Sequence, residues 1–353
     1  MIQPHPPQAP SGPPRTGSFH VRRRALVRAG AALALGAALL VPAIAAAQSP
    51  SAAPASAGAV TLVDDEGTTV TLGAPPQRVI SLSPANTEIA YALGAGHLIV
   101  GGTDYDDFPA EAAAKPDVAT YQGVLMEQVV ALEPDLVLAS GNGFTAPADI
   151  ARMRELGYPV LVVYADSVEG VLHDIELIGD ALGEGAAARD LTAGMQAHID
   201  QVTAAVAKVG DRPRVFYEIG SEPELYGPAP GSFIADMVEL AGGDPITTGD
   251  PNAFAIPVER LVAADPQVIV VGDALYGVCP ADVSGRPGWD VMSAVKTGDV
   301  RPIDDTEVTR PGPRLAQGLA NLARAIHPEL QLDGIPVEAP PCGPAAVGGP
   351  TLR

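Results

Sequence analysis

The chain has 353 residues and carries 42 acidic against 21 basic side chains, which gives a net charge of −21 at pH 7. Charge attraction to nucleic-acid phosphates or anionic lipid headgroups is therefore not expected, and nucleic acid is excluded as a partner. The length is sufficient for two ordinary domains.

The first 47 residues predict an export signal. Three arginines (22–24) precede an apolar run (29–44) and three alanines that end at Ala47. This order is typical of a signal peptide cleaved near Ala47, so we expect a periplasmic or extracellular location. Arg23-Arg24 also fit a twin-arginine signal, and the choice of export route stays open. The alternative is an uncleaved anchor, for which the apolar run is short.

Two segments beside the predicted domains have compositions that cannot build a core. Residues 48–58 are an Ala/Ser/Pro linker, and 336–353 are a Pro/Gly-rich tail that we expect to be disordered. Cleavage after Ala47 would leave 306 residues with a net charge of −26, because the leader holds five arginines and no acid.

Residues 59–183 alternate between strand-like and helix-like runs and predict a first α/β lobe. The expected elements are a hairpin at 61–72, strands at 78–82, 98–102, 136–139 and 159–164, and helices at 84–94, 126–132, 147–156 and 167–182. Alternation of this kind predicts a mainly parallel sheet covered by helices.

A long helix is predicted to separate two lobes. Apolar residues recur at 191, 195, 199, 202 and 206, which predicts one helix from 186 to 209, about 35 Å long, within an interdomain segment at 184–210. The strand–helix pattern then resumes, with a strand at 214–220 and a helix at 231–243, and defines a second α/β lobe at 211–335. A single continuous sheet is the alternative.

One helix–turn–strand unit occurs twice. "MEQVVALEPDLVLAS" starts at Met126 and "VERLVAADPQVIVVG" at Val258, and aligning their prolines places Glu127 on Glu259. A carboxylate in the first turn of a helix is favoured by the helix dipole, so a purely structural role is one interpretation of each glutamate.

Four segments in this order carry a family resemblance: "RVISLSPANTEIAYALGAG" (78–96), "GGTDYDDFPAEA" (101–112), "ATYQGVLMEQVVALEPDLVLAS" (119–140) and "GWDVMSAVKTGDV" (288–300). Over residues 60–330 the chain resembles the substrate-binding proteins of ABC importers that capture cobalamin, ferric siderophores and haem. The resemblance implies two Rossmann-like lobes with mainly parallel sheets, joined by one long rigid helix, with the ligand between them. A rigid connecting helix implies a modest rocking of the lobes.

The resemblance also implies a partner, the ABC permease–ATPase complex in the membrane. Family members set one exposed glutamate from each lobe against permease arginines, and Glu127 and Glu259 match those positions. Ion pairs of this kind contribute orientation and association rate more than affinity.

The ligand site is expected between the lobes, beyond the carboxyl ends of the strands. Aromatic side chains are only 4% of the chain, yet several fall in the loops expected there. The candidate ligand contacts are Tyr105, Phe108, Tyr121, Tyr226, Tyr276, Trp289 and Arg310. Flat rings offer a macrocycle wide apolar contact with little loss of side-chain entropy. Ordinary loop packing is the alternative for each ring, and it is favoured for Trp289.

Motifs for catalysis are missing. The sequence has no G-x-x-x-x-G-K-[ST] loop and no G-x-S-x-G elbow, so ATP hydrolysis is assigned to another subunit and no enzyme activity is expected. His97, His173, His198 and His327 lie far apart, so neither a bound metal nor a cofactor other than the ligand is expected.

The two cysteines, Cys279 and Cys342, predict a disulfide in an exported protein. Its loop entropy would contribute about 4 kcal/mol in the simple model. Two free thiols are the alternative.

The sequence thus predicts a monomeric solute receptor that binds one large metal chelate and makes or breaks no bond. The resemblance favours a cobalamin-type corrinoid, then a ferric siderophore, then haem. Arg286, Arg310 and Arg314 are available for an anionic siderophore. A two-lobed enzyme would instead need perturbed titratable groups in the cleft. A surface module without a ligand would have an occluded cleft.

Overall fold

The computed structural model describes residues 59–336 and Cys342. The predicted signal peptide (1–47), the predicted linker (48–58) and all of the predicted tail except Pro336 and Cys342 lie outside the described residues. In the part of the chain that is described, no helix is both long and apolar enough to cross a membrane.

The first lobe is built on a six-stranded sheet with the strand order β6-β5-β4-β3-β7-β8. Its strands are β3 (Val79–Ser81), β4 (Ile99–Thr103), β5 (Asp117–Thr120), β6 (Gly123–Val124), β7 (Leu136–Ser140) and β8 (Val160–Val163). Every neighbouring pair is parallel except β5 with β6. β7 and β8 are continuous apolar runs that are almost wholly buried, because helices cover both faces of the sheet. The sequence predicted β3, β4, β7 and β8 and missed β5 and β6.

The predicted hairpin is present as β1 (Val60–Val63) and β2 (Thr69–Leu72). Four helices complete the first lobe: α1 (Pro84–Ala92), α2 (Met126–Leu132), α3 (Pro147–Glu155) and α4 (Val168–Leu182). Ser83 caps α1 through the backbone N–H of Asn86, as a serine before a helix-starting proline predicts. α4 ends at Gly183, whose φ of 81° suits glycine.

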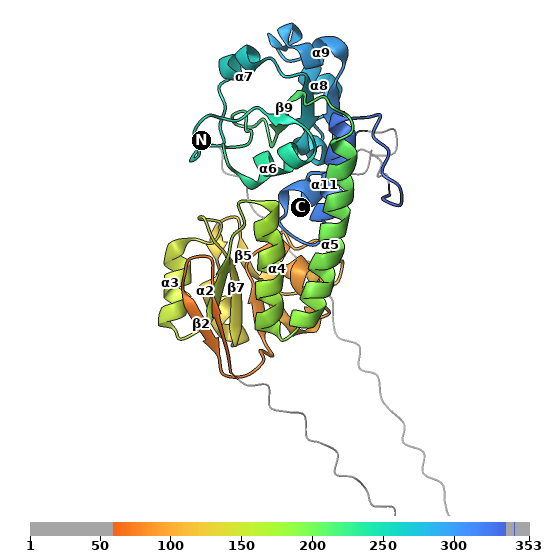
Figure 1. The fold of residues 1–353 in the computed structure, drawn as a ribbon. Helices are drawn as coiled ribbons and strands as arrows, with labels where there is room; N and C mark the ends of the chain where they lie inside the picture. The colour runs from red at the N-terminus through yellow and green to blue at the C-terminus, as the bar shows by residue number, and fades with distance from the viewer. Residues whose placement is uncertain (1–58, 337–341, 343–353) are drawn as a thin grey trace, which may run out of the picture. The chain divides into compact units, whose positions relative to one another are not determined.

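α5 (Gly185–Val206) is the predicted long helix, 22 residues and about 33 Å long, and it runs alongside both halves of the described chain (Figure 1). The predicted apolar stripe faces inward, with Met195, Ile199, Val202 and Val206 buried.

The second lobe has its own four-stranded parallel sheet in the order β10-β9-β11-β12. Its strands are β9 (Arg214–Glu218), β10 (Asp244–Pro245), β11 (Val268–Val271) and β12 (Val300–Pro302). Its helices are α6 (Phe233–Leu240), α7 (Val258–Ala264), α8 (Pro280–Ser284), α9 (Ser293–Thr297), α10 (Asp305–Thr309) and α11 (Leu315–Ile326). The two sheets are separate, so the alternative of one continuous sheet is wrong. The predicted lobe boundaries at 183–184 and 210–211 stay predictions.

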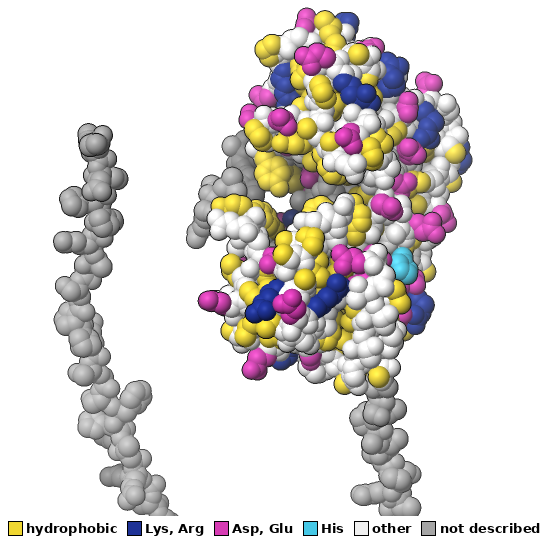
Figure 2. Space-filling view, turned by 90° about the vertical axis from the view of Figure 1, so that its left-hand side faces the viewer, with side chains coloured by type: hydrophobic (Ala, Val, Ile, Leu, Met, Phe, Trp, Pro, Cys, Tyr) yellow, Lys and Arg dark blue, Asp and Glu magenta, His cyan; other side chains and the backbone are white. Residues whose placement is uncertain are grey.

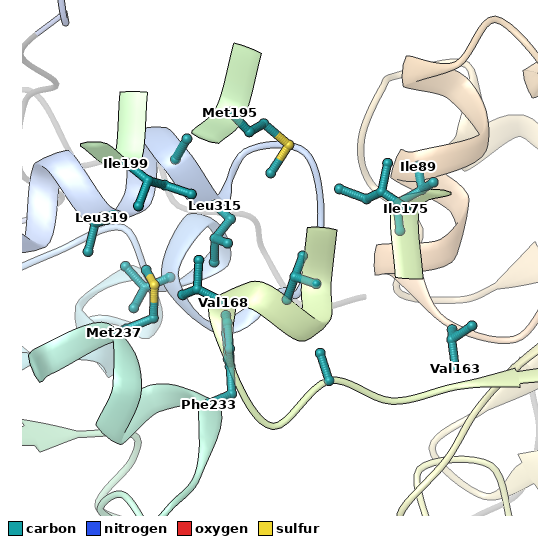
Figure 3. Packing of buried hydrophobic residues seen from close by; sticks show 14 of the residues in the cluster. Ile89, Val163, Val168, Ile175, Met195, Ile199, Phe233, Met237, Leu315 and Leu319 are labelled. Atoms are coloured by element: carbon teal, nitrogen blue, oxygen red, sulfur yellow. The ribbon is translucent and has the colours of Figure 1, made fainter. Parts of the chain in front are cut away.

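One hydrophobic cluster extends through both lobes (Figure 3). It joins side chains from five helices: Ile89 of α1, Ile175 of α4, Met195 and Ile199 of α5, Met237 of α6, and Leu315 and Leu319 of α11. The lobes are therefore held by a shared core as well as by the connecting helix, and a wide opening would expose that core to water.

A polar contact reinforces this shared core. Asp236 of α6 accepts a hydrogen bond of 2.7 Å from the backbone N–H of Val168, the first residue of α4. An acceptor from the second lobe thus satisfies a free N–H at the start of a first-lobe helix, and its negative charge suits the helix dipole.

A disulfide joins Cys279 to Cys342, which ties the described end of the chain to the start of α8.

Candidate ligand-binding site

A pocket of about 830 Å³ lies between the two sheets. The first lobe contributes residues that follow β3, β4, β5, β7 and β8, and the second lobe contributes residues that follow β9, together with the start of α6 and the end of α10. The segments that follow strands lie at the carboxyl ends of the sheets, where ligands of open α/β sheets bind. In space-filling view the described chain is hollowed between its two halves, with hydrophobic side chains on both rims (Figure 2).

Aromatic rings from both lobes line the pocket. They are Tyr105, Tyr121, Phe144 and Tyr164 from the first lobe and Tyr226, Phe233 and Phe254 from the second. Three of them, Tyr105, Tyr121 and Tyr226, were predicted from the sequence. Tyr121 is 78% exposed, so a large flat ligand would find an accessible ring without displacing protein contacts.

Sequence reasoning missed Phe144, Tyr164, Phe233 and Phe254. Tyr164 directly follows β8 and Phe144 lies in the loop after β7. The rule that identified Tyr105, an aromatic just past a strand end, would also have found Phe144, whereas Tyr164 fell inside the strand expected at 159–164. Phe233 and Phe254 gave no such signal, because neither directly follows a strand of the sheet.

Three predicted ligand contacts do not line the pocket. Trp289 is only 3% exposed and packs in the core of the second lobe. The guanidinium carbon of Arg286 lies over the Trp289 ring, 4.6 Å from the ring centroid. The interpretation of Trp289 as loop packing is therefore correct, and its assignment as a ligand contact is wrong. Tyr276 is exposed, but it is not among the residues that line the pocket.

Phe108 is held away from the pocket by a contact between the lobes. The guanidinium of Arg314, from the second lobe, lies 4.5 Å from the centroid of the Phe108 ring in the first lobe. A cation–π contact at this distance stabilises the pairing and engages the face of the ring. Phe108 is thus part of the junction between the lobes.

Arg310 lines the pocket, but its charge is already matched. Its guanidinium donates to Glu88 of α1 (3.1 Å) and to both carboxylate oxygens of Asp107 in the loop after β4. Loss of hydration lowers the pKa of Arg310, but the hydrogen bonds to Asp107 and Glu88 outweigh it and raise the pKa above its ordinary value. Arg310 therefore reaches the pocket with its charge already matched by two carboxylates.

The other two arginines proposed for anionic siderophores are matched in the same way. Arg314 donates two hydrogen bonds to the buried carboxylate of Glu88, at 2.9 and 2.7 Å. Arg286 donates two to Glu218, at 2.6 and 2.7 Å. Bidentate pairs of this geometry are the strong form of the arginine–carboxylate contact. No arginine of the three is left to bind an anionic ligand.

Carboxyl groups of the pocket wall have raised pKa values. Burial, together with the nearby carboxylate of Asp65, raises the pKa of Asp174 to about 9, so this carboxyl keeps its proton at neutral pH. Burial also raises the pKa of Asp305 to about 6, although it accepts hydrogen bonds from the hydroxyls of Tyr217 and Thr309. A protonated Asp174 offers both a donor and an acceptor without a charge.

The repeated unit is reproduced in three dimensions. α2 and α7 start and end at equivalent positions, and Glu127 and Glu259 are exposed in their first turns. Each helix ends at an acidic residue in the left-handed conformation, Glu133 (φ 45°) and Asp265 (φ 48°). The two glutamates are therefore presented by copies of one local structure.

Among the described residues, no group of three or more histidine, cysteine, aspartate or glutamate side chains could hold a metal ion.

The family model for periplasmic binding proteins matches residues 79–307. An uncharacterised ABC transporter substrate-binding lipoprotein of Bacillus subtilis is 33% identical over 274 residues, which cover 76% of this chain and 86% of that protein. A cobalamin-binding protein of Halobacterium salinarum is 31% identical over 278 residues, 76% of this chain and 74% of that protein.

Solved structures share the architecture. A periplasmic haem-binding protein of Roseiflexus is 25% identical with a TM-score of 0.62, over 72% of this chain and 99% of that one. The periplasmic vitamin B12 binding protein of Vibrio cholerae is 23% identical with a TM-score of 0.63, over 71% and 97%, and at that identity it shows the fold alone. Because the family model covers residues 79–307 and two relatives are 31–33% identical over 76% of this chain, the chain belongs to the periplasmic binding protein family.

Proposed function

We propose that the protein captures one large metal chelate without net negative charge, with a cobalamin-type corrinoid as the first candidate, and delivers it to an ABC permease–ATPase complex. The observation that carries this proposal is a pocket of about 830 Å³ lined by aromatic rings, in which the one lining cation of the described residues, Arg310, is already neutralised.

The size of the pocket supports a large ligand. Sites for drug-sized molecules measure about 300–1,000 Å³, so this pocket stands toward the upper end of that range. Its aromatic rings come from both lobes and suit a broad flat ligand that contacts both at once.

The charge of the pocket selects among chelates. Asp149, Asp174 and Asp305 line it alongside Arg310. A ferric catecholate or a haem with its propionates would bring negative charge to a wall with no free cation, and burying an unpaired charge is strongly unfavourable. Cyanocobalamin has no net charge, and its macrocycle is edged with carboxamides, which the neutral carboxyl of Asp174 can meet as donor or acceptor.

Titration calorimetry with four probes tests this proposal: cyanocobalamin, a ferric hydroxamate, a ferric catecholate and haemin. We expect cyanocobalamin to bind more tightly than 1 µM, which corresponds to about −8 kcal/mol. The ferric catecholate and haemin should bind at least tenfold more weakly. Tight binding of either anionic chelate, with none of cyanocobalamin, would refute the charge argument.

A ferric hydroxamate receptor is the second candidate. Hydroxamate chelates lack the high negative charge of catecholates, so the same neutralised arginines admit them. Haem remains third. The calorimetric comparison separates the first two candidates directly.

We also propose that the protein performs no chemistry on its ligand. Family members are binding proteins, but Asp174 and Asp305 are the kind of perturbed carboxyls that an enzyme would use. Incubation with the bound chelate followed by mass spectrometry should return the chelate unchanged. A modified product that disappears in Asp174→Asn would instead establish catalysis.

Handover to the membrane complex is proposed to use Glu127 and Glu259. Both are exposed at the start of equivalent helices, as a two-point contact with a two-fold permease requires. The double variant Glu127→Ala/Glu259→Ala should bind the reconstituted permease–ATPase complex at least tenfold more weakly, with chelate affinity unchanged. Unaltered binding to the complex would remove this role from the glutamates.

The chain is further proposed to act as an exported monomer. Mass spectrometry of the mature protein should place its first residue near Gln48, and light scattering should give the mass of one chain. A mature chain that keeps residues 1–47 would contradict the export signal.

A further inference from the structure

We propose that Arg78 and Arg214 are positioning residues for permease docking, each fixing the helix that presents one of the two glutamates. The inference rests on the docking role proposed for Glu127 and Glu259, and it adds a pair of residues that do not line the pocket.

The two arginines occupy equivalent places. Arg78 immediately precedes β3, the first strand of the first sheet, and Arg214 is the first residue of β9, the first strand of the second sheet. The guanidinium of Arg78 donates twice to the carbonyl of Leu132, at 2.9 and 2.6 Å. That of Arg214 donates to the carbonyl of Ala264 (2.9 Å). Leu132 and Ala264 are the last residues of α2 and α7.

A second contact of each arginine is also duplicated. The backbone N–H of Arg78 donates to Asp135 (2.8 Å), and that of Arg214 donates to Gln267 (3.1 Å). Asp135 and Gln267 are equivalent residues just after each helix. In both lobes, an arginine at the start of an interior strand therefore bonds to the end of the helix that carries the glutamate and to the residue three positions beyond it.

These helices need such support. Each has only seven residues, fewer than two turns, and a helix that short is marginal without tertiary contacts. Each also ends in a non-glycine residue with positive φ, which is an unfavourable conformation. An arginine that donates to the last carbonyls satisfies free acceptors and places a positive charge at the negative end of the helix.

The consequence concerns the glutamates at the other end. With its C-terminal end bonded to the sheet, each helix holds its first turn in one orientation, so the two carboxylates form a preorganised pair. Preorganisation increases affinity because less freedom is lost on binding. Binding to the membrane complex then depends on two arginines that lie about one helix length away from the glutamates.

The test measures binding of the full-length mature protein to its cognate permease–ATPase complex in nanodiscs. Arg78→Met and Arg214→Met should each weaken binding about five- to tenfold, and the double variant should show the product of the two losses. Arg212→Met is the matched control, because Arg212 donates to carbonyls at the end of α6, which carries neither glutamate. It should bind within twofold of the wild type.

Double-mutant cycles separate positioning from general destabilisation. In a Glu127→Ala background, Arg78→Met should weaken binding no further, because the group that it positions is gone. In a Glu259→Ala background it should keep its full effect. Full additivity in both backgrounds would overturn the inference.

Hydrogen exchange supplies a readout independent of the partner. Arg78→Met should speed exchange in α2 and leave α7 unchanged, and Arg214→Met should do the reverse, with affinity for the chelate retained. If Glu127→Ala itself binds like the wild type, the proposed docking role fails and this inference falls with it. If Glu127→Ala weakens binding and Arg78→Met does not, only the positioning role is refuted.

Discussion

Two sets of contacts join the lobes, and they differ in physical character. One is the apolar core shared by α4, α5, α6 and α11, whose side chains are almost fully buried. The other is the cluster of Glu88, Asp107, Arg310 and Arg314, whose arginine side chains are about one-fifth exposed. The apolar set depends on buried area and holds the lobes together. The charged set adds less stability, but under the proposed function it sets the charge that a ligand meets. The comparison separates the residues that hold the lobes from those that we propose select the ligand.

The largest expected effect belongs to the apolar set. Leu315→Ala should lower the free energy of unfolding by about 3 kcal/mol, because a fully buried leucine at the junction of α11 with the core leaves a cavity. Urea unfolding at pH 7 measures the loss. Leu156→Ala, at a position 41% exposed, is the control and should change stability by less than about 0.5 kcal/mol. A loss at Leu315 no larger than that of the control would contradict the assignment of a shared core.

A substitution in the charged set should change both the free energy of unfolding and the preference for ligand charge. Glu88→Gln should lower the free energy of unfolding by about 2 kcal/mol, because Arg314 loses its bidentate partner, and the partial exposure of the arginines keeps the loss below that of a fully buried pair. The freed positive charge should also strengthen binding of a ferric catecholate about tenfold. Glu155→Gln, in an exposed pair with Arg152, is the control. If catecholate affinity does not rise, Glu88 does not set the charge selectivity of the pocket.

The pocket wall itself should show a pH dependence. Because the pKa of Asp174 rises from 3.8 to about 9 on folding, the folded protein holds a proton that the unfolded chain releases. The stabilising contribution is complete below about pH 4 and is lost as pH rises through about 9. Asp174→Asn should therefore be more stable than the wild type at pH 8, on the order of 5 kcal/mol, with the difference vanishing near pH 4.

Thermal unfolding between pH 4 and 9 checks this prediction. Asp180→Asn, at an exposed position near the end of the same helix, should leave the pH profile of the wild type unchanged. Parallel profiles for Asp174→Asn and the wild type would show that Asp174 does not hold its proton.

The smallest effect is expected at the exposed edge of the charged set. The side chain of Asp107 is 63% exposed and Arg310 keeps Glu88 as a partner, so Asp107→Asn should lower stability by less than about 1 kcal/mol. The loss should disappear in 1 M NaCl, because salt screens exposed pairs. A loss that persists at high salt would place Asp107 with the buried contacts instead.

Much of the fold could be predicted because it is local. Apolar runs predicted the strands at 136–140 and 160–163, and helical periodicity predicted the helix at 168–182. The structure confirms all three within a residue or two. α11 shows the limit: its buried Leu315, Leu319 and Leu322 follow a helical spacing that the sequence analysis overlooked. β6 and β10 have two residues each, and such short strands exist only because a neighbouring strand pairs with them.

The candidate site divides in the same way. Tyr105, Tyr121 and Tyr226 were found because loops beyond strand ends gather at one edge of a sheet. Trp289 was also expected in a loop, yet it packs into the second-lobe core, the outcome that the sequence favoured for this ring. The ion pairing of Arg310 depends on Glu88, which is 222 residues away in the chain.

By itself the sequence determined the alternation of strands and helices, the long connecting helix and the duplicated glutamates, since periodicity and repetition are properties of neighbouring residues. Only the tertiary structure decided which aromatic rings reach the pocket, that Arg310 in its wall is already paired, and that the lobes share one core. Those outcomes depend on burial and on charge pairs between residues far apart in the chain, and their energies exist only once the lobes have packed.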